Sequence, residues 1–487
     1  MKNKRTGGVS QAAILRLIPL KFKMNRKSIA IGKDKVWSLF SKRLFPSMFG
    51  MVSLVLVTAI DGIFIGHTVG SAGIAAVNLC QPLLMLFMGL GLMFGVGCSL
   101  VAEKFFSENK EYDARIHVTQ AVLCATVLTL IIMALVLAFP HGTAQLLGSS
   151  EAVEPLVVDY LRGFMPAVLI QVWCIIGLYV MRLDGWSGLA VWCSVVAAVV
   201  SVALDWAFIN QLDMGMQGAA IATSISVAIS GLMVVAVVYP KRRTNRVKMC
   251  HLSDVLKNFG ANMQNLYHQC VIGLMAFFGQ FRIAVLIFVG NQLFMHYLGD
   301  TGVGAFGIAC FYCPFVFMLG RAIALSAQPS ITRHMNTSPA RVLRVQKYAL
   351  FTAFVSGALA TMLFRLCPEA LASVFVGSGD PAWALSVEGM PSLSLGFLFF
   401  VLNFAAIGYY QSVNRLKQAM TYELLRGIVL LIPAFILLPK LLDAAGIWLA
   451  MPVAEFLTFA VITFHSAMWI ERDSMRKRVK EDKQRTV

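Results

Sequence analysis

Long apolar segments separated by short polar ones make up most of the chain. A helical stretch of about 20 apolar residues crosses the hydrocarbon core of a bilayer. The pattern predicts an all-α membrane protein with twelve transmembrane helices, because helices satisfy their own backbone hydrogen bonds in lipid. The expected spans are 44–66, 73–103, 115–140, 155–181, 188–209, 217–239, 262–295, 303–332, 341–365, 389–411, 417–438 and 446–470.

Composition and charge agree with a membrane location. The chain has 487 residues, of which 58% are apolar and 13% charged, and these values exclude an ordinary soluble, disordered or fibrous protein. The formal net charge of +17 would favour nucleic acid as a partner of a soluble protein. Here the Lys and Arg residues flank apolar spans, so we expect the lipid bilayer as the partner and no nucleic acid.

Three basic segments divide the chain. Residues 1–43 hold twelve Lys or Arg residues, and the tail 471–487 holds seven. The third basic segment is the linker 240–261. The positive-inside rule places all three in the cytoplasm, against the anionic inner leaflet. Residues 44–239 and 262–470 then form two lobes of six helices each, and no cleavable signal peptide is visible.

The two lobes show weak internal similarity. A His–Gly–Gly pattern recurs 229 positions later, as His67, Gly70 and Gly73 against His296, Gly299 and Gly302. Residues 218–223 (GAAIAT) correspond to 446–451 (GIWLAM) at an offset of 228. Two pseudo-symmetric six-helix bundles with a binding site between them are typical of secondary transporters. Chance similarity between Gly- and Ala-rich helices is the alternative.

Two acids lie inside apolar spans, Asp61 in the first and Asp205 in the fifth. Ionisable residues in a membrane are costly and point to function. Two carboxylates sharing a site of low dielectric can hold a proton near neutral pH and titrate as a unit. A Na⁺ ion would instead need a cage of oxygen ligands. The structural alternative is that either acid caps a broken helix or forms an ion pair.

The second half carries five further charged residues in or near its spans: Arg282, Arg321, Glu423, Arg426 and Glu455. We expect structural pairing, with Glu423 and Arg426 on one helical face and Glu455 neutralising Arg282 or Arg321. An arginine that faces a cavity unpaired would favour an anionic or zwitterionic substrate.

Catalytic motifs are absent from the sequence. It has no HExxH, GxSxG or Walker loop, so we expect neither an enzyme nor a cofactor nor an ATP-driven pump. No selectivity filter of a channel is legible. Cys310 and Cys313 form a CxxC inside an apolar span, and we expect them to be packing residues rather than a metal or redox site.

Several segments between about 40 and 470 together resemble one transporter family. They are LFPSMFGMVSLVLVTAIDGIFIGHTVG with IAAVNLCQP, then RLDG, SVALDWAFI, LDMGMQGAAIAT and AQPSITRH. In order and spacing they are similar to the multidrug and toxic compound extrusion (MATE) family, in its bacterial MepA-like and DinF-like branch. The resemblance implies a multidrug efflux antiporter of the bacterial cytoplasmic (inner) membrane, linked to antibiotic resistance. Such a protein exports cationic or amphipathic compounds in exchange for H⁺ or Na⁺, and we expect a monomer.

The resemblance also assigns residues to the cation-coupling site. Asp61 precedes the G-x-F-x-G of the first helix and Asp205 is the acid of the fifth. By resemblance, Thr223 completes the site, with the backbone carbonyl of Ala219 as a further ligand. The family often has Asn where this chain has Ser201; the missing amide oxygen favours H⁺ over Na⁺.

Two other positions carry weaker implications. By resemblance, Pro46 bends the first helix when the site is protonated; it could equally start that helix. Leu183 of the RLDG segment stands where the family often has Asn, and we expect the neighbouring Asp184 to make a structural contact at a helix end.

A flippase for lipid-linked precursors or polysaccharides, from the same superfamily, is the alternative function. Flippases of this kind commonly have fourteen spans or a more cationic cavity. The twelve expected spans and the two acids favour extrusion, whereas Arg282 and Arg321 favour the alternative.

Overall fold

The computed structural model describes residues 36–183, 187–238, 250, 263–335 and 338–485. Segment 1–35, most of the linker 240–261 and Asp184 lie outside the described residues. The described part is helical and contains no strand. Its elements are α2 (Val36–Thr68), α3 (Ser71–Ser107), α4 (Glu111–Ala138), α5 (Pro140–Leu147), α6 (Glu154–Leu183), α7 (Ser187–Asp205), η1 (Trp206–Gln211), α8 (Gly215–Val238), α10 (Met263–His334), α11 (Pro339–Leu366), α12 (Pro368–Phe375), α13 (Pro381–Ser412), α14 (Leu416–Leu424), η2 (Leu425–Val429) and α15 (Leu431–Arg485).

Within the described residues these helices make twelve crossings. Nine segments are long and apolar enough to span a membrane, and two of them, with 72 and 52 residues, are too long for one crossing. A straight helix of 72 residues would be about 108 Å long. The longer segment turns back at Gly299 and the shorter one at Asp443. Counting both arms of each, and adding the 33-residue α2, gives the twelve spans that the sequence predicts.

The internal repeat is visible in the fold. Helices α4 and α11 both have 28 residues and begin 228 positions apart. The eight-residue helices α5 and α12 begin with Pro140 and Pro368, again 228 positions apart. Gly70 and Gly299, predicted to correspond, both have positive φ, +83° and +64°. The similarity between the halves is therefore structural and not a chance of composition.

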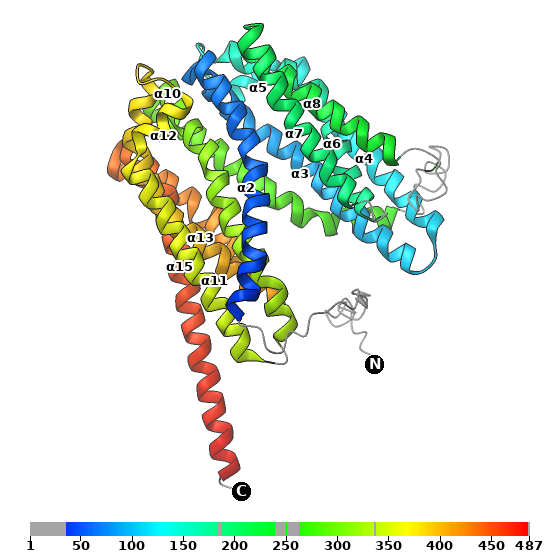
Figure 1. Cartoon of the computed structure of the whole chain (residues 1–487), viewed down its shortest axis with the longest axis vertical. Helices are drawn as coiled ribbons and strands as arrows, with labels where there is room; N and C mark the ends of the chain where they lie inside the picture. The colour runs from blue at the N-terminus through cyan, green and yellow to red at the C-terminus, as the bar shows by residue number, and fades with distance from the viewer. Residues whose placement is uncertain (1–35, 184–186, 239–249, 251–262, 336–337, 486–487) are drawn as a thin grey trace, which may run out of the picture.

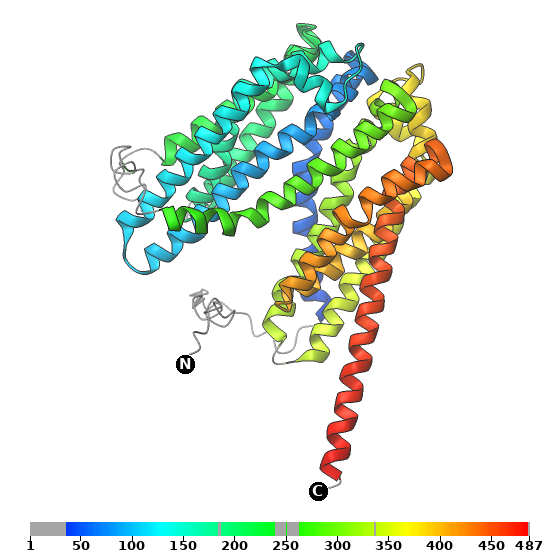
Figure 2. The ribbon, with the colours of Figure 1, turned by 180° about the vertical axis from the view of Figure 1, so that it is seen from behind.

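The two halves form lobes joined at one end. The ribbons of α3–α8 and those of the second arm of α10 with α11–α15 meet near α5 and α12 and diverge toward the end where α15 leaves the bundle (Figures 1 and 2). The start of α2 and the end of α15 lie at this divergent end (Figure 1), as an even number of crossings requires. We call it the inner end, after the topology that the positive-inside rule predicts from the sequence, and the opposite end the outer end.

The first helix of each half packs against the other half. At the start of α2, the ring of Trp37 lies 5.3 Å from that of Tyr348 on α11. In the first arm of α10, Gly273 approaches the backbone of Met93 on α3 so closely that a Cβ would come within 1.9 Å of its carbonyl oxygen. Both helices therefore connect the lobes.

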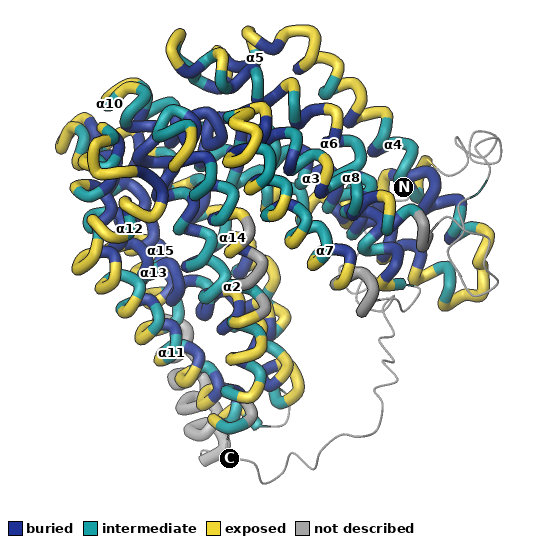
Figure 3. The backbone as a smooth tube through the Cα atoms, turned by 45° about the horizontal axis from the view of Figure 1, so that its top comes forward, coloured by how far each residue is buried: buried dark blue, intermediate teal, exposed yellow. Residues whose placement is uncertain are grey.

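Large apolar side chains cover the outer faces. On α11, Phe351, Leu359 and Met362 are 63%, 62% and 58% exposed. Exposed positions follow the outside of the helices, and buried ones gather where helices meet (Figure 3). Such a surface suits lipid rather than water, and together with the spans it shows a multi-pass membrane protein.

Closely packed glycines hold α2 in place. Gly62 and Gly66 lie four residues apart on α2, a spacing at which small residues let helices approach closely. A Cβ on Gly62 would lie 2.8 Å from the Phe311 ring, and one on Gly66 would lie 2.1 Å from the carbonyl oxygen of Phe375. Backbone cannot yield as a side chain can, so Gly66 is the less tolerant position.

We expect Gly66→Ala to lower the thermal denaturation midpoint in detergent, at a cost of about 1–3 kcal/mol, the usual range for overpacking. Gly279→Ala is the matched control, because a Cβ there meets nothing within 4 Å. A Gly66→Ala protein as stable as the control would contradict the packing.

Candidate functional site

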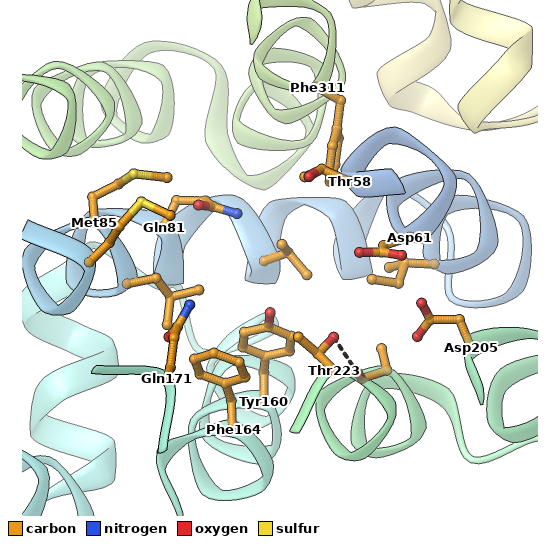
Figure 4. A pocket seen from close by; sticks show the side chains of 15 residues that line it. Thr58, Asp61, Gln81, Met85, Tyr160, Phe164, Gln171, Asp205, Thr223 and Phe311 are labelled. Atoms are coloured by element: carbon orange, nitrogen blue, oxygen red, sulfur yellow. Dashed lines mark hydrogen bonds between the residues drawn. The ribbon is translucent and has the colours of Figure 1, made fainter. Parts of the chain in front are cut away.

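The two acids of the first lobe face each other. Asp61 projects from α2 and Asp205 from the end of α7, with their carboxyl groups turned toward one another (Figure 4). Asp205 is only 1% exposed. Each carboxyl group has one buried oxygen without a hydrogen-bond partner in the described chain, Oδ1 of Asp61 and Oδ2 of Asp205. The structure thus brings together the two residues singled out in the sequence, with oxygens still free to bind a cation.

A local irregularity follows Asp205. The α-helix α7 ends at this residue and continues as the π-helical segment η1. π-Helical turns are rare and frequently occur at functional sites. The carbonyl oxygen of Phe208 in η1 lies close to Gly218 of α8. Helix α8 can therefore approach Asp205 closely.

The remaining predicted site residues differ in position. Thr223 and Ala219 line the acidic pocket, and the Thr223 hydroxyl donates a hydrogen bond of 3.0 Å to the Ala219 carbonyl. Ser201 is buried and is not among the lining residues; its hydroxyl accepts a weak hydrogen bond from Ser226 at 3.4 Å. Pro46 lies inside α2, which begins at Val36, so the reading in which it starts the helix is wrong.

The pocket also contains polar residues that the sequence reasoning missed. Tyr160, Gln171 and Gln81 point into it (Figure 4). Oε1 of Gln171 is buried without a hydrogen-bond partner among the described residues. The two glutamines could have been noticed as uncharged amides inside apolar spans. An amide costs less free energy in a membrane than a charge does, so it is a weaker indication of a functional site.

The pocket around Asp61 and Asp205, which we call the acidic pocket, has a volume of about 190 Å³. It adjoins a larger cavity of about 370 Å³ between the lobes, which we call the central cavity. Thr58, Gln81 and Phe311 belong to the walls of both. The central cavity is lined mainly by aromatic, aliphatic and Met side chains, including Met85, Met88, Phe294, Phe306, Phe317, Met318, Trp448 and Met451. Deformable apolar walls of this kind accept flat lipophilic compounds of different shapes.

Hydrogen bonds join the two halves of the chain toward the outer end of the cavity. Asn78 of α3 donates to the Asn291 side chain at 2.6 Å, and Asn291 of α10 donates to the Asn78 carbonyl at 2.9 Å. Both residues are at most 3% exposed. Closer to the outer surface, the Ser71 amide donates to Asp380 at 2.9 Å, and the Ser150 hydroxyl donates to Asp300 at 2.7 Å.

The charged residues of the second lobe largely pair with one another. Nε of Arg426 lies 3.1 Å from Glu455, and Arg282 lies 3.6 Å from Glu423. Asn403 donates to the second Glu455 oxygen at 2.7 Å. Structural pairing is confirmed, but the expected partners were wrong: Glu423 pairs with Arg282, and Glu455 with Arg426. The cause is the turn of α15 at Asp443, which folds the second arm of that helix back so that Glu455 lies beside Arg426 of η2.

The described residues hold no group of three or more His, Cys, Asp or Glu side chains placed to bind a metal. Cys310 and Cys313 both lie in the wall of the central cavity. For a Na⁺ ion, the acidic pocket offers the carboxylates of Asp61 and Asp205 and the hydroxyl of Thr223. The Ala219 carbonyl accepts a hydrogen bond from Thr223 and keeps a second lone pair. Side-chain oxygens of Gln81, Tyr160 and Gln171 line the same pocket.

A two-lobed, twelve-helix bundle with an acidic pocket opening into a cavity between the lobes defines a class, the polytopic membrane transporters. Comparison with known proteins specifies it further. Residues 46–207 match the family model MatE. A multidrug export protein MepA from Staphylococcus saprophyticus is 22% identical over 436 residues, covering 88% of this chain and 93% of that protein. A MepA from Staphylococcus aureus is likewise 22% identical, with coverages of 87% and 92%.

Solved structures agree with this assignment. An inward-facing MATE family transporter of the MOP superfamily aligns with a TM-score of 0.78, at 18% identity over 90% of this chain and 99% of the other. An outward-facing one aligns with a TM-score of 0.66, at 19% identity over 90% and 97%. The MATE multidrug transporter DinF-BH, solved as a ligand complex, gives 0.64, at 25% identity over 91% and 97%. Residues 46–207 thus match the MatE family model, and over about 90% of its length the chain shares the fold of MATE transporters of known structure.

Proposed function

We propose that this protein is a secondary active multidrug efflux antiporter, which exports cationic or amphipathic compounds in exchange for an inbound cation by alternating access. The observation that carries the proposal is the pair Asp61 and Asp205, facing each other in a pocket that shares wall residues with the apolar central cavity. The names of the related MepA proteins, which are multidrug export proteins, support the substrate class.

The acid pair can make ion and substrate compete. Two carboxyl groups this close in a medium of low dielectric strongly disfavour double ionisation, so the pair holds a proton between them. A lipophilic cation entering the central cavity brings positive charge toward the same carboxyl groups through the shared wall at Thr58 and Gln81. Each cation weakens binding of the other, which is the requirement for exchange.

The arrangement of the lobes supports an inward-facing state. The hydrogen bonds of Asn78, Ser71 and Ser150 join the lobes on the outer side, while the helices diverge toward the inner end (Figure 2). The higher TM-score against the inward-facing transporter, 0.78 against 0.66, points the same way. In this state the acid pair is reached from the cytoplasm, where it releases its cation and the substrate enters.

We propose H⁺ as the coupling ion, because the two facing carboxyl groups can share one proton and Ser201 faces Ser226 rather than the pocket. The test is reconstitution into liposomes, with a pH gradient or a Na⁺ gradient imposed separately while ethidium movement is followed. Movement driven by the pH gradient alone is expected. Movement driven by Na⁺ alone would overturn the choice of ion, and movement under neither would overturn the antiport.

A gate variant tests the alternating-access part. Asn291→Leu removes both hydrogen bonds to Asn78 and leaves that amide unpaired, each bond being worth about 1 kcal/mol. We expect the population with an open outer end to rise by about tenfold or more, measured as a longer distance between spin labels on α5 and α12.

The matched control is Thr126→Val, which removes the hydrogen bond that Trp173 donates within the first lobe. It should leave the distance distribution unchanged. An Asn291→Leu protein with the distribution of the wild type would show that these bonds do not hold the outer end closed.

The flippase alternative makes a different prediction. A lipid-linked intermediate would be translocated by the reconstituted protein while ethidium would not. We expect the reverse, because the acid pair suits an exported cation better than a pyrophosphate headgroup.

A further inference from the structure

One stripe of the second arm of α10 forms a wall of the central cavity. Phe306, Cys310, Pro314, Phe317 and Arg321 all line that cavity. They follow one another at intervals of three or four residues, so they lie on one face of the helix. Arg321 ends this stripe, and its side chain therefore belongs to the cavity rather than to the lipid-facing surface.

Arg321 differs from the other arginines of the second lobe that the sequence singled out. Arg282 and Arg426 each contact a glutamate. In the described part of the chain Arg321 has no such carboxylate within ion-pair distance, and among the described lining residues of the central cavity it is the one charged side chain. Arg321 is exposed in the structure, so its guanidinium, which is always charged, can be reached by a compound that enters the cavity.

Arg321 and the acid pair lie at different depths between the outer and the inner end of the protein. Arg321 follows Gly299, at the outer turn of α10, by 22 residues, which is about 33 Å of helix. Asp61 precedes the outer turn at Gly70 by nine residues, or about 14 Å. Arg321 therefore lies roughly 20 Å nearer the inner mouth, and a compound entering from the cytoplasm meets it before the acids.

We infer that Arg321 forms a second subsite of the cavity, which binds the carboxylate of a flat amphipathic compound whose ring lies against Phe317 and Met318. A guanidinium binds a carboxylate in bidentate fashion, and Phe317 and Met318 line the cavity one helical turn before it. The substrate range thus includes zwitterions as well as cations. This inference rests on the proposed function, since it takes the central cavity as the substrate site.

Two dyes that differ by one methyl group test it. Rhodamine 123 is a methyl ester and a cation, and rhodamine 110 is the corresponding free acid and a zwitterion. Binding of each to the detergent-solubilised full chain is measured by fluorescence anisotropy. We expect Arg321→Gln to weaken rhodamine 110 binding by roughly ten- to hundred-fold, the loss of a charge-assisted bidentate contact, and to leave rhodamine 123 unchanged or tighter. Arg321→Lys should keep part of the preference.

The control is Arg333→Gln, which removes the same charge from the last turn of α10, outside the lining of either cavity. It should affect neither dye. Equal weakening of both dyes by Arg321→Gln, or an unchanged affinity for rhodamine 110, would overturn the subsite. Displacement of rhodamine 110 by phosphatidylglycerol but not by phosphatidylcholine would also overturn it, in favour of a lipid phosphate at the mouth.

The proposed function has a separate readout. If the wild-type protein in liposomes moves rhodamine 123 under neither a pH gradient nor a Na⁺ gradient, the proposed antiport is wrong. The binding results still test the role of Arg321 in that case. If rhodamine 123 is exported and Arg321→Gln leaves rhodamine 110 binding intact, the subsite fails and antiport stands.

Discussion

Replacing Asp61 by Asn is expected to reduce gradient-driven dye export to the level of protein-free liposomes. The amide has nearly the shape of the carboxyl group but carries neither the negative charge nor the exchangeable acidic proton, so the pair with Asp205 can no longer hold and release one cation. Packing around Asp61 should survive, because the pocket beside it is roomy. Export driven by an imposed gradient in proteoliposomes is the measurement, together with the denaturation midpoint as a check of folding.

The matched control for this variant is Glu388→Gln. Glu388 is an exposed acid of α13 that lines neither the acidic pocket nor the central cavity, so its loss tests the effect of removing a carboxylate that lies outside the site. It should export dye at the rate of the wild type. Export at that rate by the Asp61→Asn protein would remove the acid pair from the mechanism.

The second large effect is expected on stability, at Glu455. Arg426 is 1% exposed, its Nη1 and Nη2 atoms lack hydrogen-bond partners among the described residues, and it lies 4.2 Å from the centre of the Phe400 ring. Glu455 supplies the opposing charge and also accepts from Asn403. Glu455→Ala leaves a buried guanidinium uncompensated, which costs about 3–5 kcal/mol. We expect a large fall in the denaturation midpoint or a failure to fold.

Two comparisons separate charge from packing at this position. Glu423→Ala removes the ion-pair partner of Arg282. This ion pair is 3.6 Å long and partly exposed to solvent, so its loss should lower the free energy of unfolding by about 1 kcal/mol or less. Replacing Glu455 and Arg426 together by Met should recover much of the lost stability, because no charge is then left unpaired. A stable but inactive Glu455→Ala protein would instead make the pair part of the transport machinery.

Much of the fold was predictable because a membrane reduces the choices. Once twelve apolar spans are counted, helices are the one structure that satisfies the backbone in lipid for this pattern. The repeat of Gly70 and Gly299 also pointed correctly to equivalent turns, both with positive φ. The short helices α5 and α12 were missed, since eight residues are too few to cross a membrane and carry no span signal.

The candidate site was predictable only in part. Asp61 and Asp205 stand out since a charge inside an apolar span is rare, and the structure brings them together. Their neighbours depend on which helices pack against one another, which sequence spacing does not reveal. Ser201 therefore faces Ser226 instead of the pocket, and Glu455 has Arg426 as its partner. Tyr160 lines the pocket although nothing in the sequence indicated it.

Proton release on substrate binding is the decisive measurement of exchange at the acid pair. Ethidium is added to the detergent-solubilised full chain in weak buffer without Na⁺ near neutral pH, and released protons are counted against bound dye. We expect about one proton per bound ethidium for the wild type, and none for the Asp61→Asn, Asp205→Asn double variant. Dye binding to the wild type with no proton released, or equal release from the double variant, would contradict it.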